Sequence, residues 1–274
     1  MLVIYSIIFG IIQGLTEFLP VSSTGHLVIF HEVWPMDLAS DLGFDVILHA
    51  GTFFALFGFF YADIVKYLKG FFRSFKHWNW QNDLDQRLAW LIIIGTIPAT
   101  IIGYFFESEI ENQLRSLWVV VVALAAGAGL IFLAERLSRK DKPIESVNAG
   151  KALTIGLSQS LALIPGVSRS GITIITGLFV GLKREEAARF AFLLSIPVIG
   201  GAGLKKTIDL WQGGALTQDW LIYLVGFLAS LSSGYFCVKY FLRYLKSRSL
   251  APFAYYRLIL GLVLVVLLLT RVLN

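Results

Sequence analysis

The sequence contains little charge and almost no cysteine. Only 15% of its 274 residues are Asp, Glu, Lys or Arg, whereas a soluble domain has about 25%. The single cysteine, Cys237, excludes an internal disulfide and a cysteine metal cluster. The basic residues form no arm and do not interleave with aromatic residues, so we expect no nucleic-acid partner. Because 57% of the residues are hydrophobic and the mean hydropathy is +0.74, the sequence predicts an integral membrane protein.

Long continuous apolar runs indicate membrane-spanning helices rather than barrel strands, which would be short and alternating. Two further apolar stretches, 1–32 and 150–182, are each interrupted near the middle by proline, glycine and hydroxyl residues. Irregular backbone at membrane depth must be buried in protein or line a wet cavity, so we predict two re-entrant helix hairpins. The N-terminus lacks a basic segment and a cleavage site, which favours a retained helix over a signal peptide. The predicted complete spans are 44–62, 88–106, 117–135, 188–204, 220–240 and 257–272.

The two broken stretches are similar to each other in sequence. "GIIQGLTEFLPVSSTGHLVIF" (10–30) aligns without a gap on "GLSQSLALIPGVSRSGITIIT" (156–176). The identical residues of the first copy are Gly10, Gln13, Leu15, Val21, Ser22, Gly25 and Ile29. We therefore predict an all-α membrane domain over 1–274 that arose by duplication. Repeat 1 (1–140) and repeat 2 (150–274) would each hold one hairpin and three transmembrane helices.

Loop charges predict the orientation of the two repeats. An odd number of crossings per repeat requires the second repeat to have the inverted topology. The loops at 66–77, 135–142, 182–189 and 243–249 are basic, and the loop at 107–113 is acidic. Since basic loops remain in the cytoplasm, this pattern places both termini outside and makes the hairpins enter from opposite sides.

The two hairpins differ in the groups that carry chemistry. In the alignment, Glu17 lies opposite Leu163, Ser23 opposite Arg169, and His26 opposite Ile172. If the hairpin tips meet, a carboxylate, a hydroxyl, an imidazole and a guanidinium share one site. We take these four residues, Glu17, Ser23, His26 and Arg169, as the catalytic candidates.

These groups suit a phosphate ester or anhydride. Arg169 offers a planar fork of donors to phosphate oxygens, and helix N-termini after the glycine-rich breaks favour anions. His26 can act as base, acid or nucleophile, and Glu17 can orient a base, hold a metal ion or accept a proton. The substrate-binding candidates are Gln13, Ser22, Thr24, Gly25, Gly166, Ser168, Ser170 and Thr173.

Each candidate also has a structural interpretation. The hydroxyls of Ser22 and Ser168 can bond to helix carbonyls, and Gln13 can form an interhelical hydrogen bond. His49 either lines the cavity or caps a polar pair with Asp45. A charge at the bilayer centre costs at least about 2.5–3.5 kcal/mol, so a role in packing alone does not explain Glu17 and Arg169. A purely structural ion pair between these two residues is the alternative.

At these residues the sequence resembles a known family. "QGLTEFLPVSSTGH" and "PGVSRSGIT" are similar to the two signature regions of the bacterial undecaprenyl-diphosphate phosphatases, also called the bacitracin-resistance family. The resemblance extends along the chain and includes "FAYYR" at 253–257. It implies removal of the terminal phosphate from the polyprenyl diphosphate left by cell-wall polymerisation. It also implies a multi-pass protein of the bacterial cytoplasmic (inner) membrane and a divalent cation, Mg²⁺ or Ca²⁺.

The resemblance assigns residues to the two motifs. The first motif matches Gln13, Glu17, Ser22, Ser23 and His26, and the second matches Ser168, Arg169, Ser170 and Thr173. Gln13 departs from members that carry glutamate at this position. This departure argues against a metal site with two carboxylates and leaves Glu17 as the candidate metal ligand.

The expected function is a lipid pyrophosphatase that opens toward the outer leaflet. Ser23 or His26 would attack the terminal phosphorus, and the sequence leaves both open. The alternative function is a flippase or transporter for a polyprenyl phosphate, alone or in addition to hydrolysis, because inverted repeats are also typical of alternating access. The difference between the two hairpins favours chemistry. The expected partners are the lipid substrate and membrane lipids. The sequence leaves open whether the protein forms a homo-oligomer.

Overall fold

The structure is a computed structural model that describes residues 1–34, 41–114, 116–212 and 219–271. Within these ranges the regular structure is helical, apart from one isolated bridge between Lys142 and Leu182. The helices are α1 (Leu2–Phe18), α2 (Ser23–Val33), α3 (Asp41–Phe59), α4 (Tyr61–Ser74), α5 (Leu84–Leu114), α6 (Leu117–Leu137), η1 (Ile144–Ser146), α7 (Ala149–Ser160), η2 (Leu161–Leu163), α8 (Arg169–Phe179), α9 (Arg184–Gln212), α10 (Trp220–Leu245) and α11 (Ala251–Leu269).

Several of these helices can cross a membrane. Among the described residues, α5, α6, α10 and α11 are each long and apolar enough, and the bent pair of α3 and α4 raises the number from four to five. The prediction of an all-helical, multi-pass membrane protein is therefore confirmed. The predicted spans at 88–106, 117–135, 188–204 and 220–240 lie within α5, α6, α9 and α10.

Two predicted spans differ at their ends. The span predicted at 44–62 is wrong at its end, because α3 stops at Phe59 and α4 turns away by 75°. The break coincides with the change from an apolar run to a charged amphipathic helix, which includes Asp63 and Lys66. The last span starts earlier than predicted, at Ala251, with a proline in the first turn of α11. Proline is tolerated there because main-chain amides in the first turn have no acceptor within the helix. Residue 272 lies outside the described residues.

The two broken stretches have the same local conformation. The short helices α2 and α8 each have 11 residues and begin after a serine in the left-handed region, Ser22 with φ 74° and Ser168 with φ 71°. Each serine Oγ accepts a hydrogen bond from the amide of a glycine three residues on, Gly25 at 3.3 Å and Gly171 at 3.1 Å. Because a positive φ is uncommon for serine, this match supports the sequence alignment of the two stretches.

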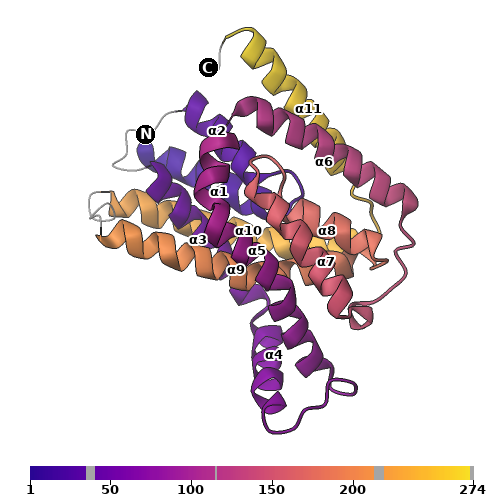
Figure 1. Ribbon diagram of the computed structural model, residues 1–274. Helices are drawn as coiled ribbons and strands as arrows, with labels where there is room; N and C mark the ends of the chain where they lie inside the picture. Colours follow the sequence, from indigo (N-terminus) through magenta and orange to yellow (C-terminus); the bar gives the residue numbers. More distant parts are fainter. Residues whose placement is uncertain (35–40, 115, 213–218, 272–274) are drawn as a thin grey trace.

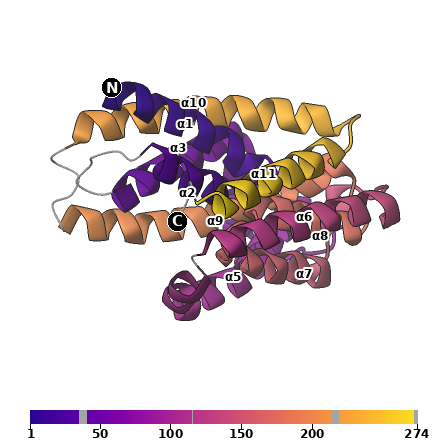
Figure 2. The ribbon, with the colours of Figure 1, turned by 90° about the horizontal axis from the view of Figure 1, so that it is seen from above.

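Helices from the two halves of the sequence exchange places in the bundle. The late helix α10 lies against α1 and α3, whereas α5 lies against α7 and α9 (Figures 1 and 2). The helices α6 and α11 pack on each other. Glycines allow the close contacts: a Cβ on Gly156 of α7 would overlap the carbonyl oxygen of Gly95 of α5. Small residues at helix interfaces are typical of membrane proteins.

The largest hydrophobic cluster supports the ends of the two broken stretches. Among the described residues, its buried side chains come from α1 and from each of the helices α3 to α11. Phe18, the last residue of α1, is 1% exposed and packs edge-on against Phe192 of α9, with 5.5 Å between ring centroids. This packing holds the first break at one place against the second half of the chain.

Candidate active site

The two breaks meet in the structure. Ser170, at the start of α8, donates a hydrogen bond of 3.1 Å to the carbonyl oxygen of Leu19, at the end of α1. Between the breaks lies a small cavity of about 20 Å³. Its walls are formed by Glu17, Ser22, Ser23, Thr24, His49, Ala162, Ile164, Gly166, Ser168 and Arg169. Three of the four predicted catalytic residues therefore share one cavity.

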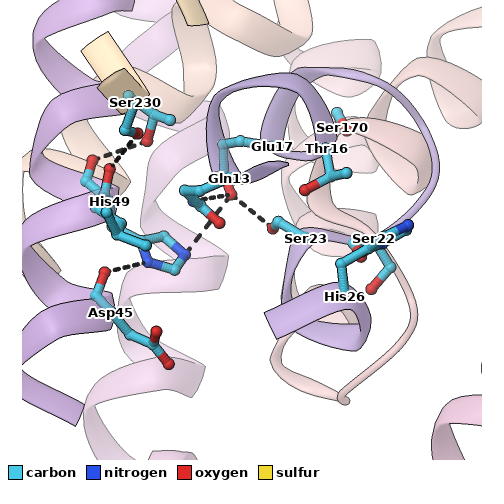
Figure 3. Close-up of polar contacts among 12 residues, drawn as sticks. Gln13, Thr16, Glu17, Ser22, Ser23, His26, Asp45, His49, Ser170 and Ser230 are labelled. Carbon is cyan, nitrogen blue, oxygen red and sulfur yellow. Dashed lines mark hydrogen bonds and ion pairs between the residues drawn. The ribbon is translucent and has the colours of Figure 1, made fainter. Parts of the chain in front are cut away.

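The Glu17 carboxylate is the centre of a polar cluster. Its Oε2 accepts hydrogen bonds from Ser23 Oγ at 2.7 Å and from Gln13 Nε2 at 3.1 Å. His49 Nε2 lies 3.6 Å from the same oxygen, too far for a hydrogen bond but close enough for an ion pair. Figure 3 shows Glu17 between His49 on one side and Ser23 on the other. A hydroxyl that already donates to a buried carboxylate is arranged for loss of its proton.

Arg169 is the first residue of α8 and lines the same cavity. Its Nη1 is buried and has no hydrogen-bond partner among the described residues. A buried donor without a partner costs free energy, so this nitrogen is suited to an anion that enters the cavity. Ser23 and Thr24, in the first turn of α2, line the cavity too. Two helix N-termini thus begin at the cavity, and each favours negative charge there.

His26 is not part of the cavity wall, and both of its ring nitrogens are engaged by other groups. Nδ1 is 2.7 Å from the carbonyl oxygen of Ser22, and Nε2 is 2.6 Å from the hydroxyl of Tyr256, whose ring stacks on the imidazole. Since a carbonyl oxygen only accepts, Nδ1 carries the hydrogen, and Nε2 accepts from the tyrosine. The side chains around the cavity do not include His26.

His49 of α3 is the histidine in the cavity wall. Its Nδ1 donates to the main-chain oxygen of Asp45 at 2.8 Å, which directs Nε2 toward Glu17. The carboxylate of Asp45 is instead 2.9 Å from Nε2 of His31. The sequence contained a signal for this residue, because a histidine four positions after an aspartate is unusual in an apolar run, but sequence alone left its role open.

The other predicted binding residues divide between the cavity and the backbone around it. Thr24, Gly166 and Ser168 line the cavity. Gly166 has φ 91°, and a Cβ there would lie 2.9 Å from Cα of Val120. The amide of Gly25 donates to Oγ of Ser22, the N-cap residue of α2, and Thr173 Oγ1 donates to the carbonyl oxygen of Arg169 at 2.7 Å. The latter two therefore shape the turns.

Arg257 of α11 is a residue that sequence reasoning missed. It is 0% exposed, and within the described ranges its guanidinium bonds to main-chain oxygens at 2.8–3.4 Å. The acceptors are the carbonyl groups of Pro20, Ala123, Leu124, Gly166 and Val167. One cation thus joins both breaks to α6. The sequence feature that could have identified Arg257 is its positive charge at the edge of an apolar span, where a charge is costly without partners.

Replacing Arg257 by methionine is expected to destabilise the protein by about 3 kcal/mol or more, because several buried carbonyl groups lose their donor at once. Thermal unfolding in detergent measures the effect as a lower midpoint. Arg257→Lys should recover only part of the loss, since three donors replace five. Arg243→Met, at an exposed arginine of α10, is the control. Equal midpoints for Arg257→Met and Arg243→Met would contradict this role.

The cavity does not fit a metal ion held by the protein alone. Among the described residues there is no group of three His, Cys, Asp or Glu side chains that could hold one. Glu17 is the only carboxylate in the described cavity wall, and its Oε2 already accepts from Ser23 and Gln13. Divalent cations such as Mg²⁺ and Ca²⁺ require about six or more oxygen ligands.

Comparison with known proteins identifies the family. A family model described as Bacitracin resistance protein BacA matches residues 6–263. The chain is 44% identical to the Undecaprenyl-diphosphatase of Rubrobacter xylanophilus over 266 residues, which cover 96% of this chain and 97% of the relative. It is 40% identical to Undecaprenyl-diphosphatase 1 of Pseudoalteromonas translucida over 268 residues, which cover 98% and 99%. The chain therefore belongs to the bacitracin resistance protein BacA family.

Proposed function

We propose that the protein is a membrane phosphatase that hydrolyses undecaprenyl (polyprenyl) diphosphate to the monophosphate and inorganic phosphate. The observation that best supports this proposal is the hydrogen bond of 2.7 Å from Ser23 Oγ to Glu17, in a cavity that Arg169 also lines. The names of the two relatives support the substrate class. In the cell, this reaction would return the lipid carrier to cell-wall synthesis at the bacterial inner membrane.

Ser23 is the nucleophile that the geometry favours. Arg169 and the N-termini of α2 and α8 would bind the terminal phosphate. Ser23 Oγ would then attack its phosphorus and pass the proton to Glu17, while the bond to the bridging oxygen breaks. The leaving group is a phosphate monoester, so it requires no general acid. After that proton has passed to solvent, Glu17 would accept a proton from the water that attacks the phosphoserine, and return it to the departing serine oxygen.

His26 is less suited to the nucleophilic role. Its Nδ1 donates to a carbonyl, and its Nε2 accepts from Tyr256. Attack by either nitrogen would first require that bond to break and the ring to turn toward the cavity. We therefore propose that His26 stabilises the turn at Ser22, the residue that directly precedes Ser23.

Binding of the lipid diphosphate would require the cavity to open. A volume of about 20 Å³ holds roughly one water molecule, and a phosphate group is larger. Residues at the two breaks form most of the walls, so a small separation of the breaks would make room. Substrate-driven closure of the same breaks would then exclude water from the reacting atoms.

A chromogenic or radiolabelled phosphate assay tests the proposed function. Purified protein in detergent should release inorganic phosphate from undecaprenyl diphosphate, and acid quench followed by mass spectrometry should find phosphate on Ser23. Absence of phosphate release from any polyprenyl diphosphate would sink the proposal. Phosphate found on His26 instead would retain the phosphatase and overturn the assignment of the nucleophile.

We expect Mg²⁺ or Ca²⁺ to bind only together with the diphosphate, whose oxygens would complete the ligand set that Glu17 begins. Calorimetric titration should detect no binding of Mg²⁺ to the protein alone. Binding should appear when a non-hydrolysable prenyl diphosphate analogue is present, beyond the binding of the metal to the analogue itself. Tight binding to the protein without analogue would contradict this expectation.

The membrane arrangement is also a proposal. We propose two inverted repeats, 1–140 and 150–274, with re-entrant hairpins that enter from opposite sides and a site that opens to the outer leaflet. The equal turns at Ser22 and Ser168 and the exchange of α5 and α10 support the repeat. The basic loops support both termini outside. Cysteine-accessibility labelling of the termini and of the basic segment 66–77, which holds the end of α4 and the residues after it, tests the orientation.

The exchanged helices also favour a second candidate function. Two repeats that interlock around paired breaks can alternate access to a central site, as a flippase for polyprenyl monophosphate requires. Vesicles with fluorescent polyprenyl monophosphate on one side separate the functions. Flip without hydrolysis by Ser23→Ala protein would support transport in addition to catalysis, and absence of flip would reject it.

His49 is proposed as a positioning residue for Glu17. Its ring is oriented by Asp45 and faces the carboxylate oxygen that Ser23 contacts. His49→Leu should lower kcat by about 10- to 100-fold with little change in KM, because the base loses its orientation while the phosphate contacts remain. His49→Gln should restore part of kcat, since its amide can donate to Glu17. His77→Leu, at an exposed loop position, is the control. If His49→Leu instead raised KM by 10- to 100-fold and left kcat unchanged, this role would be rejected.

A further inference from the structure

The helix α4 has three distinct faces. One face packs on α5 and holds the buried residues Tyr67, Gly70 and Ser74. The contact is close, because a Cβ on Gly70 would lie 2.7 Å from the main-chain carbon of Asp85. This face fixes the rotation of α4, so the directions of the other two faces are determined by the fold.

The second face is apolar and exposed. Leu68, Phe72 and Phe75 are 51%, 65% and 68% exposed, and their spacing of four and three residues places them on one side of the helix. Trp78 follows and is 63% exposed, with its ring stacked on that of Trp80 at 5.9 Å. Tryptophan is enriched at membrane–water interfaces.

The third face is cationic and lies beside the apolar one. It consists of Lys66, Lys69, Arg73 and Lys76, at spacings of three, four and three residues. Two of these cations lie near acids: Lys66 is 3.8 Å from Asp85, and Arg73 Nε donates to Asp83 at 2.9 Å. The side chains of Lys69 and Lys76 are exposed.

Asp83 remains charged beside Arg73 at neutral pH. Burial raises the pKa of Asp83, but hydrogen bonds from the amide of Gln86 and from Arg73 outweigh this and hold the pKa below its ordinary value. Arg73 is therefore neutralised locally, and the excess positive charge of this face comes from Lys69 and Lys76.

The direction of α4 suits a helix that lies on a membrane surface. It turns by 75° from α3, so if α3 follows the membrane normal, α4 runs nearly in the membrane plane. Figure 1 shows α4 projecting away from the rest of the bundle together with the beginning of α5, on which it packs. A helix with one apolar face and a lysine-rich neighbouring face is typical of the interface between headgroups and acyl chains.

We propose that α4 is a membrane-surface helix whose apolar stripe (Leu68, Phe72 and Phe75) enters the acyl boundary and whose exposed lysines, Lys69 and Lys76, bind anionic phospholipid headgroups. This inference requires α3 to cross the membrane but does not depend on the proposed phosphatase activity. The observed cation stripe is complementary to anionic lipid rather than to a second copy of this chain, which would present the same positive charge.

Site-directed spin labelling tests the position of the apolar stripe. Because the only cysteine, Cys237, is buried, a Phe72→Cys variant can be labelled selectively, with the parent protein as the background control. In phospholipid vesicles, the label should collide with dissolved oxygen more than with a polar nickel chelate. A label at the exposed Asn79, introduced as Asn79→Cys, should show the reverse. An aqueous label at position 72 would overturn the proposal, as would strong spin–spin coupling, which would indicate a second copy.

Lipid selectivity tests the lysines. A fluorescent label on Phe72→Cys should be quenched more by brominated phosphatidylglycerol than by brominated phosphatidylcholine. Each cation contributes about fivefold to this preference at low salt, so Lys69→Gln with Lys76→Gln should remove most of it. The matched control removes two exposed charges elsewhere, by Arg136→Gln with Arg139→Gln. An unchanged preference in the lysine double variant, or an equal loss in the control, would overturn the role of the lysines.

Discussion

Replacing Ser23 by alanine is expected to lower kcat for phosphate release by about 10³-fold or more, with a small change in KM. The hydroxyl is the group that Glu17 contacts at 2.7 Å, and its removal leaves the phosphate-binding groups of the cavity in place. Initial rates with undecaprenyl diphosphate in detergent measure kcat and KM separately. The phosphorylated intermediate should also disappear from acid-quenched samples.

Ser158→Ala provides a matched control for Ser23. Ser158 is a half-buried serine of α7 whose hydroxyl bonds to the carbonyl oxygen of Ile155, away from the cavity walls. Loss of this hydroxyl should leave kcat unchanged. A Ser23→Ala protein that retains more than a tenth of the parent rate would show that another group attacks the phosphorus. Phosphate trapped on His26 in that variant would identify the other group.

Replacing Arg169 by alanine is expected to have the second largest effect, a fall in kcat/KM of about 10³-fold. Its guanidinium lines the cavity with one buried nitrogen that has no partner among the described residues. The transferring phosphoryl group gains charge stabilisation from such a donor, so both binding and the chemical step should weaken. Competition by inorganic pyrophosphate should weaken in parallel, which measures the binding part without turnover.

Arg169→Lys separates charge from geometry. Lysine keeps the positive charge but cannot form the planar, two-pronged contact with phosphate oxygens, so a partial recovery is expected. Arg248→Ala, at an exposed arginine after α10, controls for the change in net charge. If Arg169→Ala kept kcat/KM within tenfold of the parent, the guanidinium would have a structural role, such as a fixed partner of Glu17, and the proposed phosphate clamp would be wrong.

Much of the fold could be predicted because membrane insertion depends on local composition. Continuous apolar runs predict α5, α6, α10 and α11, since helices satisfy their own backbone within lipid. Proline, glycine and serine clusters predicted the breaks that precede α2 and α8. The end of the first predicted span was less predictable, because an amphipathic helix follows α3 after one residue and hydropathy averages across the bend.

The candidate site was only partly predictable. The gap-free alignment of the two stretches singled out Glu17, Ser23 and Arg169, and the structure places all three at one cavity. The same alignment singled out His26 with equal strength, yet its ring bonds to Tyr256, 230 positions away in the sequence. A residue type in a motif indicates which chemistry is available, whereas the direction of its side chain depends on neighbours that are remote in sequence.

The sequence by itself determined the helical membrane class, the two breaks and the acid, serine and arginine that they carry, because these follow from hydropathy and local order. Only the tertiary structure decided that α5 and α10 exchange places, that His49 faces the carboxylate, and that Arg257 joins both breaks. Helix periodicity defines the face on which a residue lies but not the helix that covers it. Arg257 shows the limit most clearly, since its partners are main-chain carbonyl groups, which every residue carries and which therefore leave no trace in the sequence.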